Sequence, residues 1–233
     1  MATQTIKTEM GAVASSATRY VFFFGNGKAD GDKEMKPELG GKGAGLAEMT
    51  NAGLPVPPGF TIQTAACREF MRNAGKLSPQ VDEQMRQALE RLETLQGQKL
   101  GAGENPLLVS VRSGAAASMP GMMDTILNLG LNHESVQALA QRSNNPRFAY
   151  DSYRRLIHMF GSIVLEIPKN EFDEVFEKQK KRRRAKLDTD LDVKALKEIC
   201  EDYKKVIRKH AKREFPQDPM EQLTLARDAV FRS

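Results

Sequence analysis

Apolar positions divide the chain into a front part with short strand-like runs and a back part with helical spacing. Tyr20–Phe24 is an aromatic and β-branched run that ends in a Gly-Asn-Gly turn, and Phe60–Gln63 is a second short run, so both predict strands. Pro106–Arg112 predicts a buried strand that is apolar on both faces. The apolar positions of Met122–Leu129 predict one more strand.

Helical signals surround these runs. A helix is expected to begin near Leu46, after a glycine-rich stretch, and to stop at Gly53, since glycine readily ends a helix. Thr64 is the expected N-cap of a helix over 65–73. Helical spacing of apolar residues or helix-compatible composition predicts further helices over 81–95, 134–141, 146–160, 172–184, 193–210 and 220–231.

The order of these elements predicts a fold class. Strands concentrate before residue 130 and helices after it, which favours an α+β region with an attached helical subdomain over a regular βαβ alternation. We expect a flexible leader (1–19), an α/β subdomain (20–132) and a helical subdomain (133–215). The last segment (216–233) is expected to be the truncated start of a return to the core of the α/β subdomain.

Composition narrows the class of protein. In 233 residues, 40% are hydrophobic and 28% charged, which suits a globular chain with its own core. The net charge of +5 fits a polyanion such as a nucleotide but is too small to indicate nucleic acid. Cys67 and Cys200 lack disulfide or zinc spacing, so we expect a reducing, cytoplasmic location. No apolar run approaches the roughly 20 residues that a bilayer crossing needs, and no secretory signal is visible. A transit peptide is left open because acidic residues are scarce in the first 18 positions.

The first candidate for chemistry is the stretch Gly40–Gly45, which contains Lys42. It fits neither a Walker A motif nor G-x-G-x-x-G. Glycines still allow a ligand to approach the backbone closely, and a following helix offers unpaired N–H groups to an anion. The alternative is a plain tight turn before a helix.

The second candidate is Ser110–Gly114 with the small-residue stretch up to Gly121. Arg112 ends the expected buried strand, where a charge is costly unless it is paired or meets an anion. Its guanidinium suits two phosphate oxygens at once, and Ser113 and Ser118 add hydroxyl groups. The alternative is a structural pair between Arg112 and a carboxylate beside a surface loop.

Other residues carry weaker signals. The basic run Lys178–Lys186 is either a solvated helix end or a surface for an acidic partner. Asp124 lies near the second candidate and is a candidate for ordering it or for contacting the ligands of an Mg²⁺ ion, whereas Asp151 and Glu166 show no usable partner pattern. The histidines lack the surroundings of a phosphoryl carrier or a metal site; they are His133, His158 and His210. The methionines near the second candidate suit packing; they are Met119, Met122 and Met123.

Beyond this, the chain resembles the pyruvate, phosphate dikinase family. Ser118–Asp124, with the sequence Ser-Met-Pro-Gly-Met-Met-Asp, is highly specific for it, and the resemblance extends from about Tyr20 to the last residue. The matching strings are Leu39–Gly43, Leu46–Met49, Val56–Thr61, Leu108–Gly114, Ser118–Thr125, Leu127–Asn132, Arg147–Arg155 and Ala229–Ser233. Phosphoenolpyruvate synthase shares the Gly-Gly-Lys and Val-Arg-Ser themes but diverges from the methionine-rich string.

The resemblance implies the first half of an ATP-grasp nucleotide-binding domain. In the family, the lysine and arginine at the positions of Lys42 and Arg112 bind ATP phosphates. The expected ATP contacts also include backbone or hydroxyl groups of Gly41, Gly43, Ser113, Gly114, Ser118 and Gly121.

The family reaction converts ATP, pyruvate and phosphate to AMP, phosphoenolpyruvate and diphosphate through a phosphohistidine. Carboxylate ligands for Mg²⁺, the carrier-histidine domain and the pyruvate-binding barrel all fall outside this sequence, and the family suggests a homodimer. We therefore expect this chain to bind ATP phosphates without completing the transfer, and we expect neither nucleic acid nor membrane as a partner. A stand-alone nucleotide or phosphate sensor, a phosphoenolpyruvate synthase and a basic interaction module are the alternatives.

Overall fold

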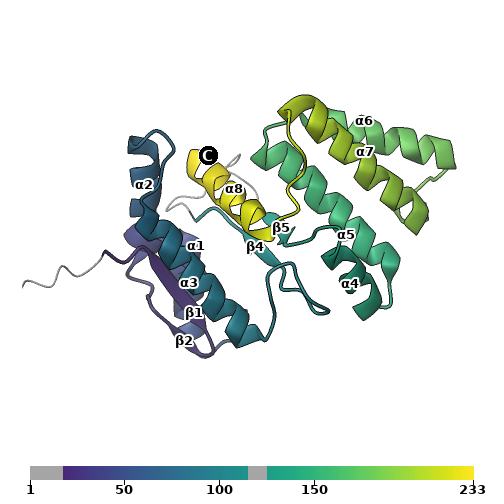
Figure 1. The fold of residues 1–233 in the computed structure, drawn as a ribbon. Coiled ribbons are helices and arrows are strands. Elements are labelled where there is room, and N and C mark those ends of the chain that lie inside the picture. Colours follow the sequence, from purple (N-terminus) through teal and green to yellow (C-terminus); the bar gives the residue numbers. More distant parts are fainter. Residues whose placement is uncertain (1–17, 115–124) are drawn as a thin grey trace, which may run out of the picture.

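The computed structural model describes residues 18–114 and 125–233, which form a mixed α and β fold (Figure 1). Two small antiparallel sheets lie in the first part of the chain, and the second part is mostly helical. The predicted α+β class is therefore confirmed. The expected leader lies almost wholly outside the described residues.

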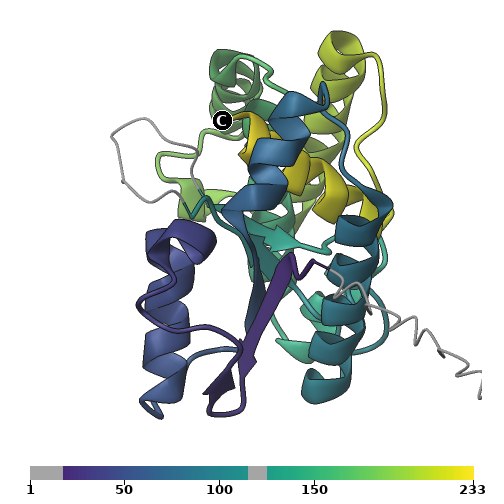
Figure 2. The same cartoon turned by 90° about the vertical axis from the view of Figure 1, so that its left-hand side faces the viewer.

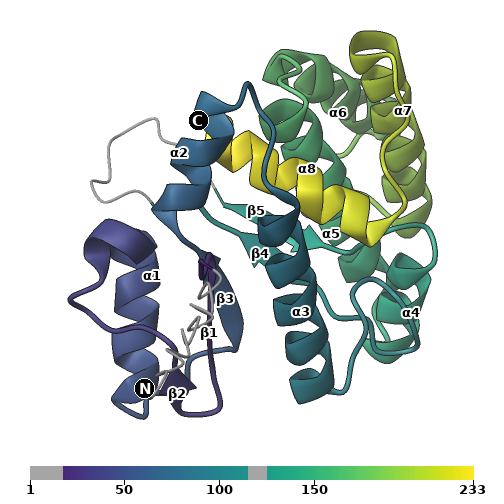
Figure 3. The same cartoon turned by 60° about the vertical axis from the view of Figure 1, so that its left-hand side comes forward.

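The first sheet has three strands in the order β2-β1-β3, and the central strand β1 is largely buried. Helix α1 packs on one side of this sheet and helix α3 on the other (Figures 2 and 3). Helix α2 follows β3 and contacts α1. The bounds are β1 (Val21–Gly25), β2 (Lys28–Ala29), β3 (Gly59–Ile62), α1 (Lys36–Asn51), α2 (Thr64–Arg72) and α3 (Pro79–Gln96).

Helix α1 corrects the predicted glycine loop. It does not begin near Leu46 but already at Lys36, and Gly40 is the one residue inside it with non-helical angles (φ 69°, ψ 170°). Proline at the first turn favours this early start, because its fixed φ suits a helix and its missing N–H would be unpaired there anyway. The predicted loop is thus a kink followed by a helical turn that contains Lys42.

The predicted cap of α2 is also wrong. Gln63, with extended angles, is the N-cap residue, and no side chain caps the helix. The Thr64 hydroxyl instead donates to the carbonyl of Pro37 at 2.6 Å, which links α2 to the start of α1.

The second sheet is smaller than the sequence predicts. Strands β4 (Val109–Val111) and β5 (Ile126–Leu129) form an antiparallel pair with an irregularity in register. Val109 and Val111 are half-buried and Ser110 is exposed, so β4 is not buried on both faces. The reason is that β4 pairs only with β5 in the described chain and turns one face outward.

The helical part agrees closely with the predicted spacing. Helix α5 continues into the π-helical turn η1, and α6 and α7 pack beside each other and beyond α5 (Figure 1). Helix α8 then returns to β4, β5 and α2. The bounds are α4 (Ser135–Arg142), α5 (Pro146–Met159), η1 (Phe160–Val164), α6 (Lys169–Arg183), η2 (Asp188–Asp190), α7 (Val193–Ala211) and α8 (Pro219–Arg232).

One large apolar cluster joins these parts. It runs from Phe23 in β1 through Ile126 and Leu129 in β5 to helices α5, α7 and α8. A second, smaller cluster packs Phe70 of α2 against Phe231 at the end of α8, with ring centroids 5.6 Å apart. Helix α8 therefore contributes to both clusters and connects the last residues of the chain to the first sheet.

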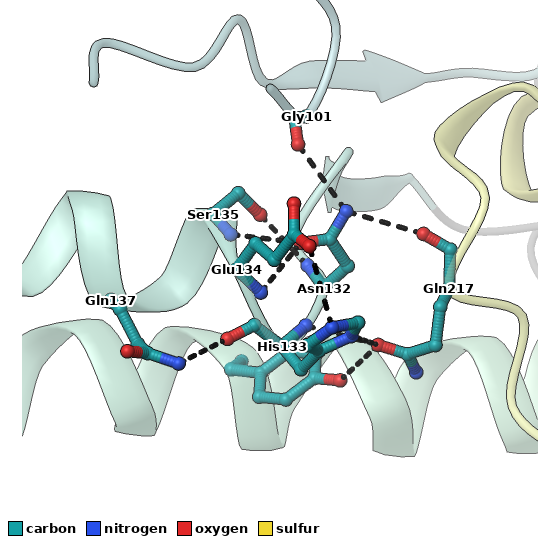
Figure 4. A network of polar contacts seen from close by, with 8 residues as sticks. Gly101, Asn132, His133, Glu134, Ser135, Gln137 and Gln217 are labelled. Carbon is teal, nitrogen blue, oxygen red and sulfur yellow. Dashed lines mark hydrogen bonds and ion pairs between the residues drawn. The ribbon is translucent and has the colours of Figure 1, made fainter. Parts of the chain in front are cut away.

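A buried polar network holds the segments that lead into and out of the helices (Figure 4). The Asn132 amide donates to the carbonyls of Gly101 and Gln217, both at 3.2 Å, and its oxygen accepts from the N–H groups of Glu134 and Ser135. Asn132 thereby uses all of its side-chain polar atoms to pair backbone groups of three segments that lie far apart in sequence.

We predict that Asn132→Ala lowers the free energy of unfolding by about 3 kcal/mol, because it leaves several buried backbone groups unpaired. Gln137→Ala is the matched control, since Gln137 is exposed and makes one bond to the carbonyl of His133. Urea unfolding of both variants is the measurement, and equal losses would contradict the assigned role of Asn132.

A buried ion pair stabilises helix α5. Asp151 accepts from Arg154 at 2.7 Å and from Arg155 at 2.9 Å, and the Arg154 side chain is only 7% exposed. Burial favours a higher pKa for the Asp151 carboxyl, but the hydrogen bonds and charges of the two arginines outweigh it and lower that pKa. Asp151 thus has partners that the sequence analysis missed, although the i+3 and i+4 spacing to two arginines was visible.

We predict that Asp151→Asn costs about 3 kcal/mol of unfolding free energy at pH 7, because Arg154 is left buried without its carboxylate. The folded-state pKa is lowered, so this stabilisation is present above the unfolded pKa of about 4 and is lost as the pH falls through the folded value. The difference between variant and wild type should therefore shrink in acid. Glu177→Gln removes an exposed carboxylate 3.8 Å from Lys180, which keeps a closer partner in Asp188, so it should change stability by less than about 0.5 kcal/mol throughout.

Candidate functional site

The structure brings the two candidate stretches together at a contact between two glycines. A side chain built on Gly40 would place its Cβ 1.4 Å from the carbonyl oxygen of Gly114. The backbone of the α1 kink therefore touches the backbone just beyond β4. Lys42 follows the first glycine by two residues and Arg112 precedes the second by two, so the Cα atom of each lies within about 7 Å of the glycine Cα at the contact.

Both cations are exposed. Lys42 lies in the helical turn after the kink and Arg112 directly after β4. Within residues 18–114 and 125–233, neither has a carboxylate oxygen within 4 Å. The sequence argument that Arg112 must offset the cost of burial does not hold. Its exposure instead leaves the guanidinium accessible to a ligand.

The other predicted site residues have different surroundings. Gly41 is half-buried beside the kink, and Ser113 is buried at 7% exposure. Gly43 is buried, and a Cβ there would lie 2.8 Å from Cγ2 of Thr61, so close packing of α1 on β3 accounts for this glycine. Ser118 and Gly121 lie outside the described residues, as do Asp124 and the three methionines.

Sequence reasoning missed Gly40 as a site residue. The signal in the sequence was the pair Gly40–Gly41. Two adjacent glycines destabilise a helix, so their presence indicates that the backbone there needs an unusual conformation or a close contact. The structure gives that reason as a left-handed φ together with the contact to Gly114.

The cysteines and histidines lie in other environments. Both cysteines are free, and burial raises the pKa of Cys200 to about 12 and raises that of Cys67. Neither is therefore a thiolate at neutral pH. Each histidine packs or pairs within the helical part: His158 lies against Phe172 and Tyr203, His133 contacts Gln217, and His210 contacts Glu171.

Three of the seven cations in the basic run Lys178–Lys186 form ion pairs with neighbouring elements. Lys180 pairs with Asp188 at 2.8 Å, and Arg183 and Arg182 pair with Glu198 at 2.9 and 3.4 Å. These pairs join α6 to η2 and α7. The three paired cations therefore stabilise helix packing at the end of α6.

Residues 18–114 and 125–233 contain neither a cluster of metal-binding side chains nor a helix suited to a bilayer. No three His, Cys, Asp or Glu side chains converge there as metal ligands would. None of the helices in those two ranges combines the length and apolar character that a bilayer crossing needs.

We predict that Lys42→Ala and Arg112→Ala each change the free energy of unfolding by less than about 0.5 kcal/mol, because both side chains are exposed. Thermal unfolding without ligand is the measurement. A loss above about 2 kcal/mol in either variant would assign that cation to the fold and not to a ligand.

Comparison with known proteins gives one consistent family. The family described as "Pyruvate phosphate dikinase, AMP/ATP-binding domain" matches residues 36–100, which include Lys42. The chain is 50% identical over 94% of its length to the chloroplastic pyruvate, phosphate dikinase of Flaveria pringlei, and 51% over 94% to dikinase 1 of Arabidopsis thaliana. It is 49% identical over 88% of its length to the enzyme of Clostridium symbiosum.

The chain spans about a quarter of the length of these relatives: 23% of the two plant proteins and 24% of the Clostridium protein. The similarity is not confined to the matched domain, because it extends over nearly the whole chain. By sequence, the chain thus belongs to the pyruvate, phosphate dikinase family and carries part of its AMP/ATP-binding region.

Proposed function

We propose that this chain supplies a clamp of two cations for the phosphates of ATP in a pyruvate, phosphate dikinase. The observation that carries the proposal is the contact of Gly40 with Gly114, which brings Lys42 and Arg112 near one place. The match to an AMP/ATP-binding domain supports the choice of ligand. Both cations are exposed, as a phosphate ligand requires.

The chemistry of the clamp is binding and charge neutralisation. The Arg112 guanidinium is suited to two oxygens of one phosphate, and the Lys42 ammonium acts as a mobile point charge. The N–H groups of Gly41 and Gly43, in the first helical turn after the Gly40 kink, are the backbone donors that we assign to the same anion. Ser113, Gly114, Ser118 and Gly121 are the further contacts that we assign to the phosphates.

These groups hold ATP and offset its negative charge, which is a large part of what phosphoryl transfer needs. In the whole dikinase, the transfer would continue through a carrier histidine to phosphate and pyruvate on other domains. Mg²⁺ would shield the phosphates in that reaction. The described residues offer no carboxylate cluster for it, so we assign no Mg²⁺ ligand to this chain.

We further propose an ATP-grasp arrangement in which residues 20–132 and 216–233 belong to the nucleotide-binding core and 133–215 to a helical subdomain. The packing of α8 against α2, β4 and β5 supports the return of the last segment to the core. The remaining dikinase domains are the proposed partners, in a homodimer. The free cysteines support a reducing compartment such as the cytoplasm.

We predict that the chain binds ATP and that Lys42→Ala and Arg112→Ala each weaken binding at least tenfold, or about 1.4 kcal/mol. Isothermal titration calorimetry is the measurement. Arg142→Ala, which removes an exposed arginine at the end of α4, is the charge-matched control and should leave the affinity unchanged.

Unchanged ATP affinity in both site variants would rule out the clamp. The chain alone is expected to form no phosphoenolpyruvate from ATP, pyruvate and phosphate, since half of a transfer site binds without completing the reaction. Formation of that product by the isolated chain would contradict this expectation.

A further inference from the structure

Backbone atoms of Gly114 leave no room for a side chain at Gly40. Its φ of 69° lies in the left-handed region, and an added Cβ would lie 1.4 Å from the carbonyl oxygen and 2.5 Å from the carbonyl carbon of Gly114. Both obstructing atoms belong to the backbone, so no side-chain rotation can relieve the clash. A residue with a side chain at position 40 must therefore move one of the two segments.

The partner glycine is far less constrained. Among the residues that the structure describes, a Cβ on Gly114 would meet only the carbonyl oxygen of Leu39, at 3.5 Å, which is an ordinary van der Waals distance. Its φ lies outside the left-handed region. The contact thus requires glycine at position 40 and tolerates alanine at position 114, although the two residues touch each other.

We propose that Gly40 is a positioning residue, whose backbone contact with Gly114 sets the spacing between Lys42 and Arg112 so that both cations act on one polyphosphate chain. This inference rests on the proposed ATP clamp and extends it to a residue that touches no phosphate through a side chain. Each cation is joined to the contact by only two residues, so a shift of the contact moves one cation relative to the other.

The alternative is that Gly40 matters only for the stability of α1. Two glycines serve as controls that separate these explanations. Gly53 has a φ of 78°, and no atom of residues 18–114 and 125–233 lies within 4 Å of an added Cβ, so Gly53→Ala imposes backbone strain without a clash. Gly45 lies within α1 without a positive φ, and an added Cβ there also meets none of the described atoms within 4 Å.

The experiment measures thermal unfolding and the affinities for ATP and inorganic tripolyphosphate in the full chain and in three variants: Gly40→Ala, Gly45→Ala and Gly53→Ala. Tripolyphosphate isolates the clamp from any contact with adenine. We expect Gly40→Ala to weaken the binding of both ligands at least tenfold and the two other variants to stay within threefold of wild type, even if Gly53→Ala melts as early as Gly40→Ala.

A folded Gly40→Ala chain with wild-type affinities would overturn the inference while leaving the clamp intact. Failure of the wild-type chain to bind either ligand would instead remove the proposed function itself.

If Gly40→Ala does not fold, the test moves to Lys42→Ala, Arg112→Ala and the double variant. Cations held at a fixed spacing act as a unit, so the double variant should bind tripolyphosphate no more than threefold more weakly than the weaker single variant. Losses that multiply would show that the two cations bind independently, and the inference would be wrong.

Discussion

Two buried amide side chains, Asn132 and Gln222, make the joining of the front and back parts of the chain possible. Where three segments meet out of contact with water, every backbone N–H and carbonyl needs a partner. Gln222 accepts from the N–H of Gly130 and donates to the carbonyls of Leu131 and Pro216. The Asn132 amide donates to the carbonyl of Gly101. Without these bonds, the turn after β5 and the segment before α8 could not be buried together. The shared apolar cluster would then lose its connection to α8.

The candidate site depends on the same junction. Helix α8 contacts both strands of the second sheet, and Arg227 of α8 is buried and reaches Asp82 of α3. Strand β4, which Arg112 follows directly, therefore packs against a helix that is itself tied to α3, and α3 packs on the first sheet. Lys42 belongs to a helix on that first sheet. The relative position of the two cations thus depends on packing between segments more than a hundred residues apart.

Element types could be predicted because apolar spacing is a local property, and helices such as α5 and α7 lie within a few residues of their predicted bounds. The errors arose where tertiary contacts decide. The start of α1 depends on a glycine kink whose partner, Gly114, lies 74 residues further along the chain. The burial of the strand before Arg112 depends on how many strands cover it, and the bond of Thr64 depends on where Pro37 lies. Lys42 and Arg112 were identifiable as candidates from their glycine-rich surroundings, but only the family resemblance, and no local pattern, implied that they lie near each other.

The contact of Gly40 with Gly114 also separates two properties of the site that usually change together. Dissolved ions screen the attraction between exposed cations and a polyanion, so higher ionic strength weakens binding. A contact between uncharged main chains is not screened. The backbone spacing between the two residues that carry the charges therefore does not depend on ionic strength. In the proposed clamp, salt would change the affinity through the side chains of Lys42 and Arg112, whereas the spacing of their main chains would stay set by the contact of Gly40 with Gly114.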